Sequence, residues 1–197
     1  LIKSTVFAHF CGGETIEDCE KTINELWKYK VGTILDYSVE GEASEKAFDE
    51  CVKETISTIE RAKNDPAIPF SVFKITGLAR FSLLEKIDAG EELTKEEVLE
   101  YERVLNRIDK ICKTAFERNV PIFIDAEESW IQKPIDAAAE RMMELYNKEK
   151  AIVYNTVQLY RKDRLTYLKK AFERAAEKNY FLGVKLVRGA YMEKERA

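Results

Sequence analysis

Histidine is almost absent from this sequence of 197 residues, because His9 is the only one. Ser-His-Asp and Cys-His catalysis both need an imidazole base beside the nucleophile, so the composition argues against them. The four cysteines are Cys11, Cys19, Cys51 and Cys112. They form no CxxC pair and no zinc-knuckle spacing, which argues against a Cys/His zinc site. We interpret them as reduced, mostly buried residues of a cytosol-like compartment.

Long apolar runs are also missing. No stretch approaches the roughly 18 apolar residues of a membrane-spanning helix, and no signal peptide is visible. The 36 acidic and 32 basic residues are interspersed, and their net charge of −4 argues against a nucleic-acid surface. Local cationic sites for small anions stay open. Because the sequence begins at Leu1 without methionine, we expect that an N-terminal segment has been removed.

Five short runs rich in β-branched residues each end on a polar residue and lead into an amphipathic helical pattern. They cover residues 33–39, 70–77, 120–129, 150–160 and 181–191. Strands that alternate with helices predict parallel pairing through right-handed crossovers. A doubly wound sheet would give a similar pattern, but the first strand-to-helix turn lacks the Gly-rich nucleotide fingerprint. We therefore favour a single α/β domain built as a β/α barrel.

Local signals predict where several helices begin. Thr15 with Asp18, and Thr94 with Glu97, match the capping-box pattern in which two side chains satisfy each other's backbone amides. Pro134 suits the first position of a helix, where no amide hydrogen is needed.

Polar residues gather at the carboxyl ends of the five runs, which in a barrel meet at one mouth. They are Asp36, Lys74, Asp125 with Glu127, Asn155 with Gln158, and Lys185 with Arg188. The set offers cations, carboxylates and amides, and we expect all of them to point toward that mouth.

Lys74 is the most informative of these residues, because an ammonium flanked by apolar neighbours needs a partner or a ligand. A structural ion pair with Asp125 or Asp36 is the alternative. Asp125 and Glu127 share a face in a regular strand and could ligate a metal. No histidine joins them and nearby lysines would compete, so we predict no metal site and prefer Asp125 as the partner of a cation.

Lys185 and Arg188 are three residues apart and therefore face opposite sides of a strand. The small residues at 189–190 would let the backbone approach a flat or phosphorylated cofactor, unless the glycine only ends the strand. Tyr160 and Tyr191 could stack on a ligand, although packing is the more common role.

Six segments together resemble the proline dehydrogenase family of FAD-dependent β/α-barrel enzymes. They are GGETIEDC, ILDYSVEG, FKITGL, IDAEESW, NTVQLYRKD and GVKLVRGAYMEKER, in order over essentially the whole chain. The sequence of these segments resembles the eukaryotic-type branch more closely, since KLVRGAY stands where many bacterial members have RLVKGAY. Lys185 thus replaces a frequent arginine and loses the bidentate geometry of a guanidinium, while Arg188 replaces a lysine.

The resemblance implies a role for several residues. Lys74 would bind the substrate carboxylate, and Tyr191 would line the pocket. Asp125 would be the active-site aspartate, hydrogen-bonded around that lysine and the flavin edge, and Lys185 would lie beside flavin N5. The residues implied for FAD binding are Ala126 through its backbone, Gln158, Arg188, Gly189 and Ala190. A glutamate that gates the site would be Glu40 or Glu42.

The implied reaction is oxidation of L-proline by hydride transfer from C5 to flavin N5, which gives Δ1-pyrroline-5-carboxylate. A quinone or another acceptor would then take the electrons. The implied location is the cytoplasm or the periphery of the inner membrane, mitochondrial in a eukaryote. Hydroxyproline is the alternative substrate.

The family barrel is a (β/α)8 TIM-type barrel, of which this chain supplies about five βα units. The last strands, with the paired arginines of a YLxRRxxE motif, are absent from residues 1–197. We therefore expect a partial barrel domain that is inactive alone and able to self-associate through open sheet edges. A non-catalytic half-barrel and a metal-dependent barrel enzyme using Asp125 and Glu127 are the other readings.

Overall fold

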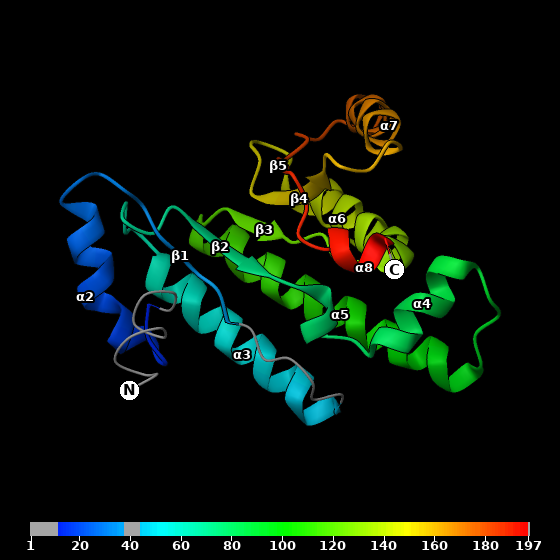
Figure 1. Cartoon of the computed structure of the whole chain (residues 1–197), viewed down its shortest axis with the longest axis horizontal. Coiled ribbons are helices and arrows are strands. Elements are labelled where there is room, and N and C mark those ends of the chain that lie inside the picture. The colour runs from blue at the N-terminus through cyan, green and yellow to red at the C-terminus, as the bar shows by residue number, and fades with distance from the viewer. Residues whose placement is uncertain (1–11, 38–43, 197) are drawn as a thin grey trace.

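A computed structural model describes residues 12–37 and 44–196 of the chain (Figure 1). Five strands form one parallel sheet: β1 (Ile34–Leu35), β2 (Phe70–Phe73), β3 (Ile122–Ile124), β4 (Val153–Gln158) and β5 (Val184–Val187). Each strand pairs with the next one along the chain, so the order is β1-β2-β3-β4-β5. The strands are shorter than the runs predicted from sequence. Asp36, Lys74 and Asp125 lie just past β1, β2 and β3, whereas Gln158 and Lys185 belong to β4 and β5.

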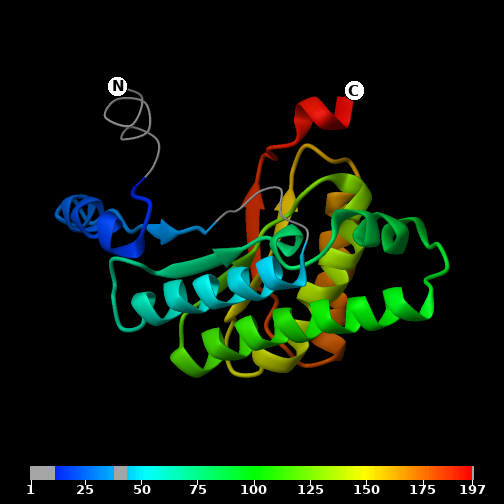
Figure 2. The same ribbon diagram turned by 90° about the horizontal axis from the view of Figure 1, so that it is seen from below.

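Among the described residues, a helix lies in every connection between these strands, and one further helix lies before the first strand and one after the last. They are α2 (Ile16–Trp27), α3 (Glu45–Ala62), α4 (Phe81–Ala89), α5 (Lys95–Arg118), α6 (Gln132–Tyr146), α7 (Arg164–Glu177) and α8 (Met192–Arg196), with 3-10 turns η2 (Ile75–Gly77) and η3 (Ser129–Ile131). Figure 2 shows α3 and α5 running together beneath β2. A sequential strand order with right-handed crossovers places the connecting helices on one face, as in a β/α barrel, whereas a doubly wound sheet reverses its order. The prediction of a β/α barrel arrangement is confirmed.

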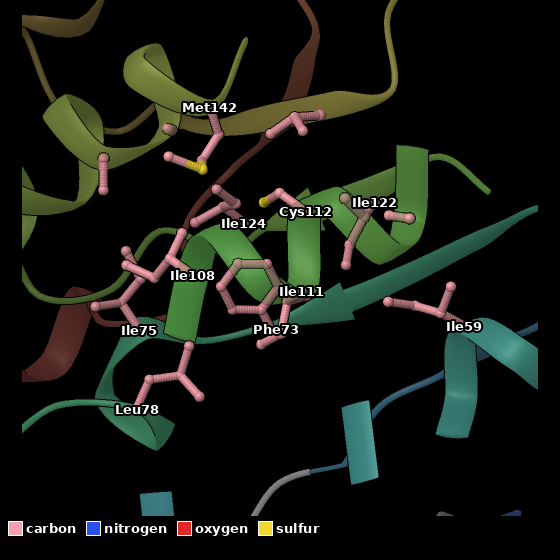
Figure 3. Close-up of a cluster of buried hydrophobic side chains, with 14 of the residues drawn as sticks. Ile59, Phe73, Ile75, Leu78, Ile108, Ile111, Cys112, Ile122, Ile124 and Met142 are labelled. Atoms are coloured by element: carbon pink, nitrogen blue, oxygen red, sulfur yellow. The ribbon is translucent and has the colours of Figure 1, made fainter. Parts of the chain in front are cut away.

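The core lies between the sheet and these helices. Phe73 of β2 and Ile124 of β3 meet Ile108 and Ile111 of α5 and Met142 of α6, as Figure 3 shows. All five side chains are at most 1% exposed. Each such burial stabilises the fold by about 1.5–3 kcal/mol, so this layer holds the strands in place.

The opposite face of the sheet carries aromatic rings. Phe70 and Phe123 stack with ring centroids 4.3 Å apart, and Tyr154 meets both rings edge-on. These residues alternate with the core positions, because successive side chains of a strand point to opposite faces. The charged residues that follow at the strand ends lie on this same inner face.

Most of the predicted helix starts are confirmed. The capping boxes of Thr15 with Asp18 and of Thr94 with Glu97 are both present. Pro134 is the third residue of α6 rather than the first, because η3 runs directly into the helix at Gln132. Its position is still tolerated, since the first amides of a helix have no partner within the helix.

None of the helices in residues 12–37 and 44–196 is long and apolar enough to cross a bilayer.

Candidate functional site

Charged side chains from four of the strands and the residues that follow them gather toward the carboxyl edge of the sheet. Lys74 follows β2, Asp125 follows β3, Lys185 belongs to β5, and Asp36 lies just after β1. The register pairs Thr156 of β4 with Lys185, so the inner faces of β3, β4 and β5 are in step. This edge is where α/β barrel enzymes hold their chemistry.

Asp125 and Lys185 form an ion pair, with Lys185 Nζ 2.6 Å from Asp125 Oδ1. Thr156 Oγ1 donates a longer hydrogen bond of 3.4 Å to the same oxygen. The ammonium also lies 4.9 Å from the centroid of the Phe123 ring, within the range of a cation–π contact. Asp125 thus holds a cation, as the residue pattern predicted, and this cation is Lys185.

Lys74 has a different partner. Its Nζ lies 3.3 Å from Asp36 Oδ2, so of the two ion-pair partners considered from sequence the structure shows Asp36. Partial burial acts to lower the pKa of the Lys74 ammonium, but the surrounding carboxylates, Asp36 foremost, hold the pKa above its usual value. Lys74 is therefore cationic at neutral pH, and its long 3.3 Å contact leaves it able to bind a further anion.

Glu127 takes no part in a joint carboxylate site with Asp125. Its side chain is 2% exposed, and both of its oxygens accept hydrogen bonds from Thr76, one of them 3.1 Å from the Thr76 backbone nitrogen. Burial raises the pKa of Glu127 to about 7, against the opposing effect of these hydrogen bonds. Within the described residues no group of three His, Cys, Asp or Glu side chains could hold a metal ion.

Gln158 lies beneath the mouth and is 1% exposed. Its Nε2 donates to the Glu127 carbonyl oxygen at 3.1 Å, whereas its Oε1 is buried without a hydrogen-bond partner in the described part of the chain. A buried acceptor of this kind is expected to pair with a donor from outside the described residues. Ala126, which precedes Glu127, is also buried.

Asn155 does not reach the mouth, and the expectation that it points there is wrong. It lies three residues before Gln158, on the opposite face of β4, where its Nδ2 donates to Asp136 Oδ1 and to the Tyr167 hydroxyl at 2.9 Å each. Arg164 Nη1 completes this buried group with a 2.6 Å contact to Asp136. Asn155 therefore joins β4 to α6 and α7.

The segment after β5 shows why a glycine stands there. Gly189 has φ +120°, and a Cβ built on it would lie 1.6 Å from Cε1 of Tyr160. The backbone thus passes directly over the Tyr160 ring, and the Tyr160 amide bonds to the Arg188 carbonyl oxygen at 3.1 Å. Arg188 and Ala190 are exposed, and Tyr191 is half-buried with Lys194 5.5 Å from its ring centroid.

Helix α8 lies beyond the carboxyl end of β5 (Figure 2). Glu195 accepts hydrogen bonds from the backbone nitrogen and hydroxyl of Ser129, both at 2.7 Å. Lys194 pairs with the buried Glu128 at 2.6 Å. These contacts tie α8 to the loop after β3. Glu40 and Glu42, the candidates for a gating glutamate, lie outside the described residues.

Two functional features of this edge escaped the sequence reasoning. Glu127 was considered as a residue of the mouth and as a metal ligand, whereas its hydrogen bonds to Thr76 depend on the pairing of β2 with β3 across 51 positions of sequence. The packing of Tyr160 against Gly189 depends likewise on the pairing of β4 with β5. Neither contact has a local sequence signal.

The family model described as proline dehydrogenase matches residues 19–197 of the chain. The chain belongs to the proline dehydrogenase family. It is 36% identical to "Proline dehydrogenase 1, mitochondrial" of Dictyostelium discoideum, in an alignment that covers all of this chain and 42% of that protein. It is 32% identical to "Carbapenem antibiotics biosynthesis protein CarD" of Pectobacterium carotovorum subsp. carotovorum, over 98% of this chain and 51% of that protein. The chain thus spans about half the length of these relatives.

Among solved structures, the chain is similar to proline utilization A (PutA) from Bdellovibrio bacteriovorus inactivated by N-propargylglycine. The TM-score is 0.80 over 99% of this chain and 22% of that one, at 20% identity. At this identity the likeness shows the fold alone, and it agrees with the parallel sheet and alternating helices of this chain.

Proposed function

We propose that the protein oxidises L-proline to Δ1-pyrroline-5-carboxylate with FAD as its cofactor. The single observation that carries this proposal is the pair of ammonium groups, Lys74 and Lys185, at the carboxyl edge of a proline dehydrogenase family sheet. They lie at the end of the sheet where barrel enzymes bind small anionic substrates. Proline offers one carboxylate and a ring carbon that must be held beside an acceptor.

Lys74 is the residue that we assign to the substrate carboxylate. Its ammonium is cationic and partly buried, and among the described residues its ion pair is the 3.3 Å contact to Asp36, so a carboxylate can add to or replace this partner. An ammonium that loses water gains strength as a hydrogen-bond donor. Tyr191, half-buried beyond β5, is the proposed wall of the pocket.

The residues of this chain fit a flavin in three respects. The buried Gln158 Oε1 needs a donor, which a heterocyclic N–H group supplies. The Lys185 ammonium, oriented by Asp125, places positive charge at the mouth. The Ala126 backbone and the segment 188–190 flank these groups. FAD, when bound, supplies the acceptor for the hydride that leaves proline C5.

The remaining parts of the proposal rest on family likeness. They are a quinone or similar electron acceptor, peripheral membrane association, and a location in mitochondria, the compartment named for the Dictyostelium relative. We also propose that the working enzyme closes the outer edges of β1 and β5 with further strands, which residues 12–37 and 44–196 leave unpaired.

Absorbance spectroscopy and kinetics of the protein as its gene encodes it test this function. We expect a visible flavin band that bleaches when L-proline is added without an acceptor. We expect Lys74→Ala to raise KM for proline about 10- to 100-fold, which is the worth of one hydrogen bond to a charged group. Lys178→Ala is the matched control, since Lys178 pairs with Glu144 far from the mouth.

Two results would overturn the proposal. One is a purified protein that neither binds flavin nor turns over proline. The other is a Lys74→Ala variant that keeps its KM but melts at a lower temperature, which would make the Lys74–Asp36 pair structural.

A further inference from the structure

Every polar group of Glu127 is engaged with a different part of the mouth. Its carboxylate accepts from the backbone nitrogen and the hydroxyl of Thr76, which lies after β2. Its own nitrogen donates to Gln132 Oε1 of α6 at 3.1 Å, and its carbonyl oxygen accepts from Gln158 Nε2 of β4 at 3.1 Å. One residue after β3 therefore ties together the ends of β2 and β4 and the start of α6.

The contact with Thr76 bears directly on Lys74. Thr76 is the middle residue of η2, which begins immediately after Lys74, and Lys74 itself makes no side-chain cap for this turn. Before Lys74 the backbone is held by the pairing of Phe73 with Ile124. After Lys74 it is held by Glu127. The ammonium thus projects from a backbone that is fixed on both sides.

Glu127 is itself anchored from behind. The Gln132 amide that receives the Glu127 nitrogen is oriented by Asp136, whose Oδ1 accepts from Gln132 Nε2 at 2.9 Å. Asp136 in turn meets Arg164 of α7. Glu127 therefore rests on α6 and α7 through buried hydrogen bonds, and motion of the η2 turn is resisted by the body of the domain.

An ionised carboxylate at this buried position lowers the stability of the fold. Among the described residues no lysine, arginine or histidine forms an ion pair with Glu127, and burial raises its pKa. A neutral glutamine would avoid that penalty, but an NH2 donor would replace one of the two oxygens that now accept from Thr76. The carboxylate gives each of the two Thr76 donors its own acceptor oxygen.

We propose that Glu127 is a positioning residue for substrate binding, which holds the turn of Thr76 so that the Lys74 ammonium faces the substrate carboxylate. This inference rests on the proposed function, because it acts through the role assigned to Lys74. It differs from a general structural role in one respect: its effect on binding disappears when Lys74 is absent.

The test compares four variants of the protein as its gene encodes it: Glu127→Gln, Lys74→Ala, the double variant of both, and Glu128→Gln. Glu128 is the matched control, since it is also a buried carboxylate of this loop but pairs with Lys194 of α8. The readouts are KM and kcat for L-proline, the inhibition constant of cyclopentanecarboxylate, flavin content and Tm. Cyclopentanecarboxylate carries the carboxylate and ring without the reactive nitrogen.

We expect Glu127→Gln to raise KM and the inhibition constant about tenfold, the worth of one hydrogen bond made with a charged partner. kcat should change less than about twofold, because the Glu127 side chain acts on substrate binding and not on the chemical step. Flavin content should not change, and Tm should not fall at pH 8, since a buried charge is removed. In the Lys74→Ala background the same substitution should leave KM unaltered, as expected for residues that act as one unit.

Additive losses in the double variant, or an equal effect of Glu128→Gln, would overturn the inference while leaving the proposed function intact. An unchanged KM in Lys74→Ala would instead remove the proposed function. If Glu127→Gln does not fold, Thr76→Val and Thr76→Ser serve in its place. The valine variant lacks the donor hydroxyl and should raise KM, and the serine variant retains it and should not; equal KM values for the two would contradict the inference.

Discussion

Replacing Gly189 by alanine tests why a glycine follows β5. The sequence alone allowed two reasons, namely a close approach of cofactor to backbone or a simple strand end. In the structure the space that a side chain would need is occupied by the Tyr160 ring, with Cε1 at 1.6 Å and Cδ1 at 1.8 Å from the ideal Cβ position. Gly189 also has φ +120°, which L residues rarely adopt.

The expected loss has two parts. Backbone strain at a positive φ costs about 1–3 kcal/mol. Steric overlap adds about 1–3 kcal/mol, since the ring must move by roughly 2 Å to reach an ordinary contact of about 3.5 Å. We expect Gly189→Ala to destabilise the end of β5 by about 2–6 kcal/mol.

Hydrogen exchange measures this loss where it arises. The amides of Leu159 and Tyr160 bond to the carbonyl oxygens of Val187 and Arg188, at 2.8 and 3.1 Å. Their exchange should accelerate about tenfold for each 1.4 kcal/mol of local destabilisation, up to the limit of full exposure. Adding Tyr160→Ala to Gly189→Ala should remove the steric cost, because the ring is gone, and should leave the cost of backbone strain.

The packing explanation fails if Gly189→Ala leaves these amides protected and yet abolishes flavin binding. That result would return the glycine to the cofactor approach considered from sequence. Tyr160→Ala alone is the necessary control, because it removes ring packing without introducing strain.

The other two predictions concern the charges of the mouth. A double-mutant cycle of unfolding with Asp125→Asn and Lys185→Met should give a coupling free energy of about 1–3 kcal/mol, since the 2.6 Å pair is partly buried. A coupling under about 0.5 kcal/mol would show that solvent screens the ion pair. Burial raises the pKa of Glu127 from 4.5 to about 7, so between these values the native state binds more protons than the unfolded chain. The free energy of unfolding of the wild type should therefore fall by about 3 kcal/mol relative to Glu127→Gln as pH rises from about 4 to 8. Parallel urea-unfolding curves across this range would contradict the burial of an ionisable Glu127.

Patterns carried by neighbouring residues were predicted well from the sequence. Alternating apolar runs and helical stripes led to the parallel sheet, because periodicity reports which faces are buried. The capping boxes at Thr15 and Thr94 were predicted because their donors and acceptors lie three residues apart. Asn155 was wrongly predicted to point toward the mouth. Its spacing from Gln158 indicates the opposite face, since residues three apart in a strand lie on opposite faces.

Pairings between strand ends were beyond such reasoning. Lys74 had two candidate carboxylates, and only the packing of the strands brought Asp36 to it and Asp125 to Lys185. Long side chains with flexible stems can reach several partners, so their choice follows small shifts in strand register and curvature. The same holds for the grip of Glu127 on Thr76.

The sequence by itself determined the succession of strands and helices, the inner placement of charge at the strand ends, and the likeness to proline dehydrogenases. These properties follow from local periodicity and residue type. Tertiary structure alone decided which charges meet, that the space beside Gly189 is filled by Tyr160, and that Glu127 supports the turn after Lys74. The physical reason is that these contacts join residues tens of positions apart, and their geometry exists only once the strands have paired and packed against the helices.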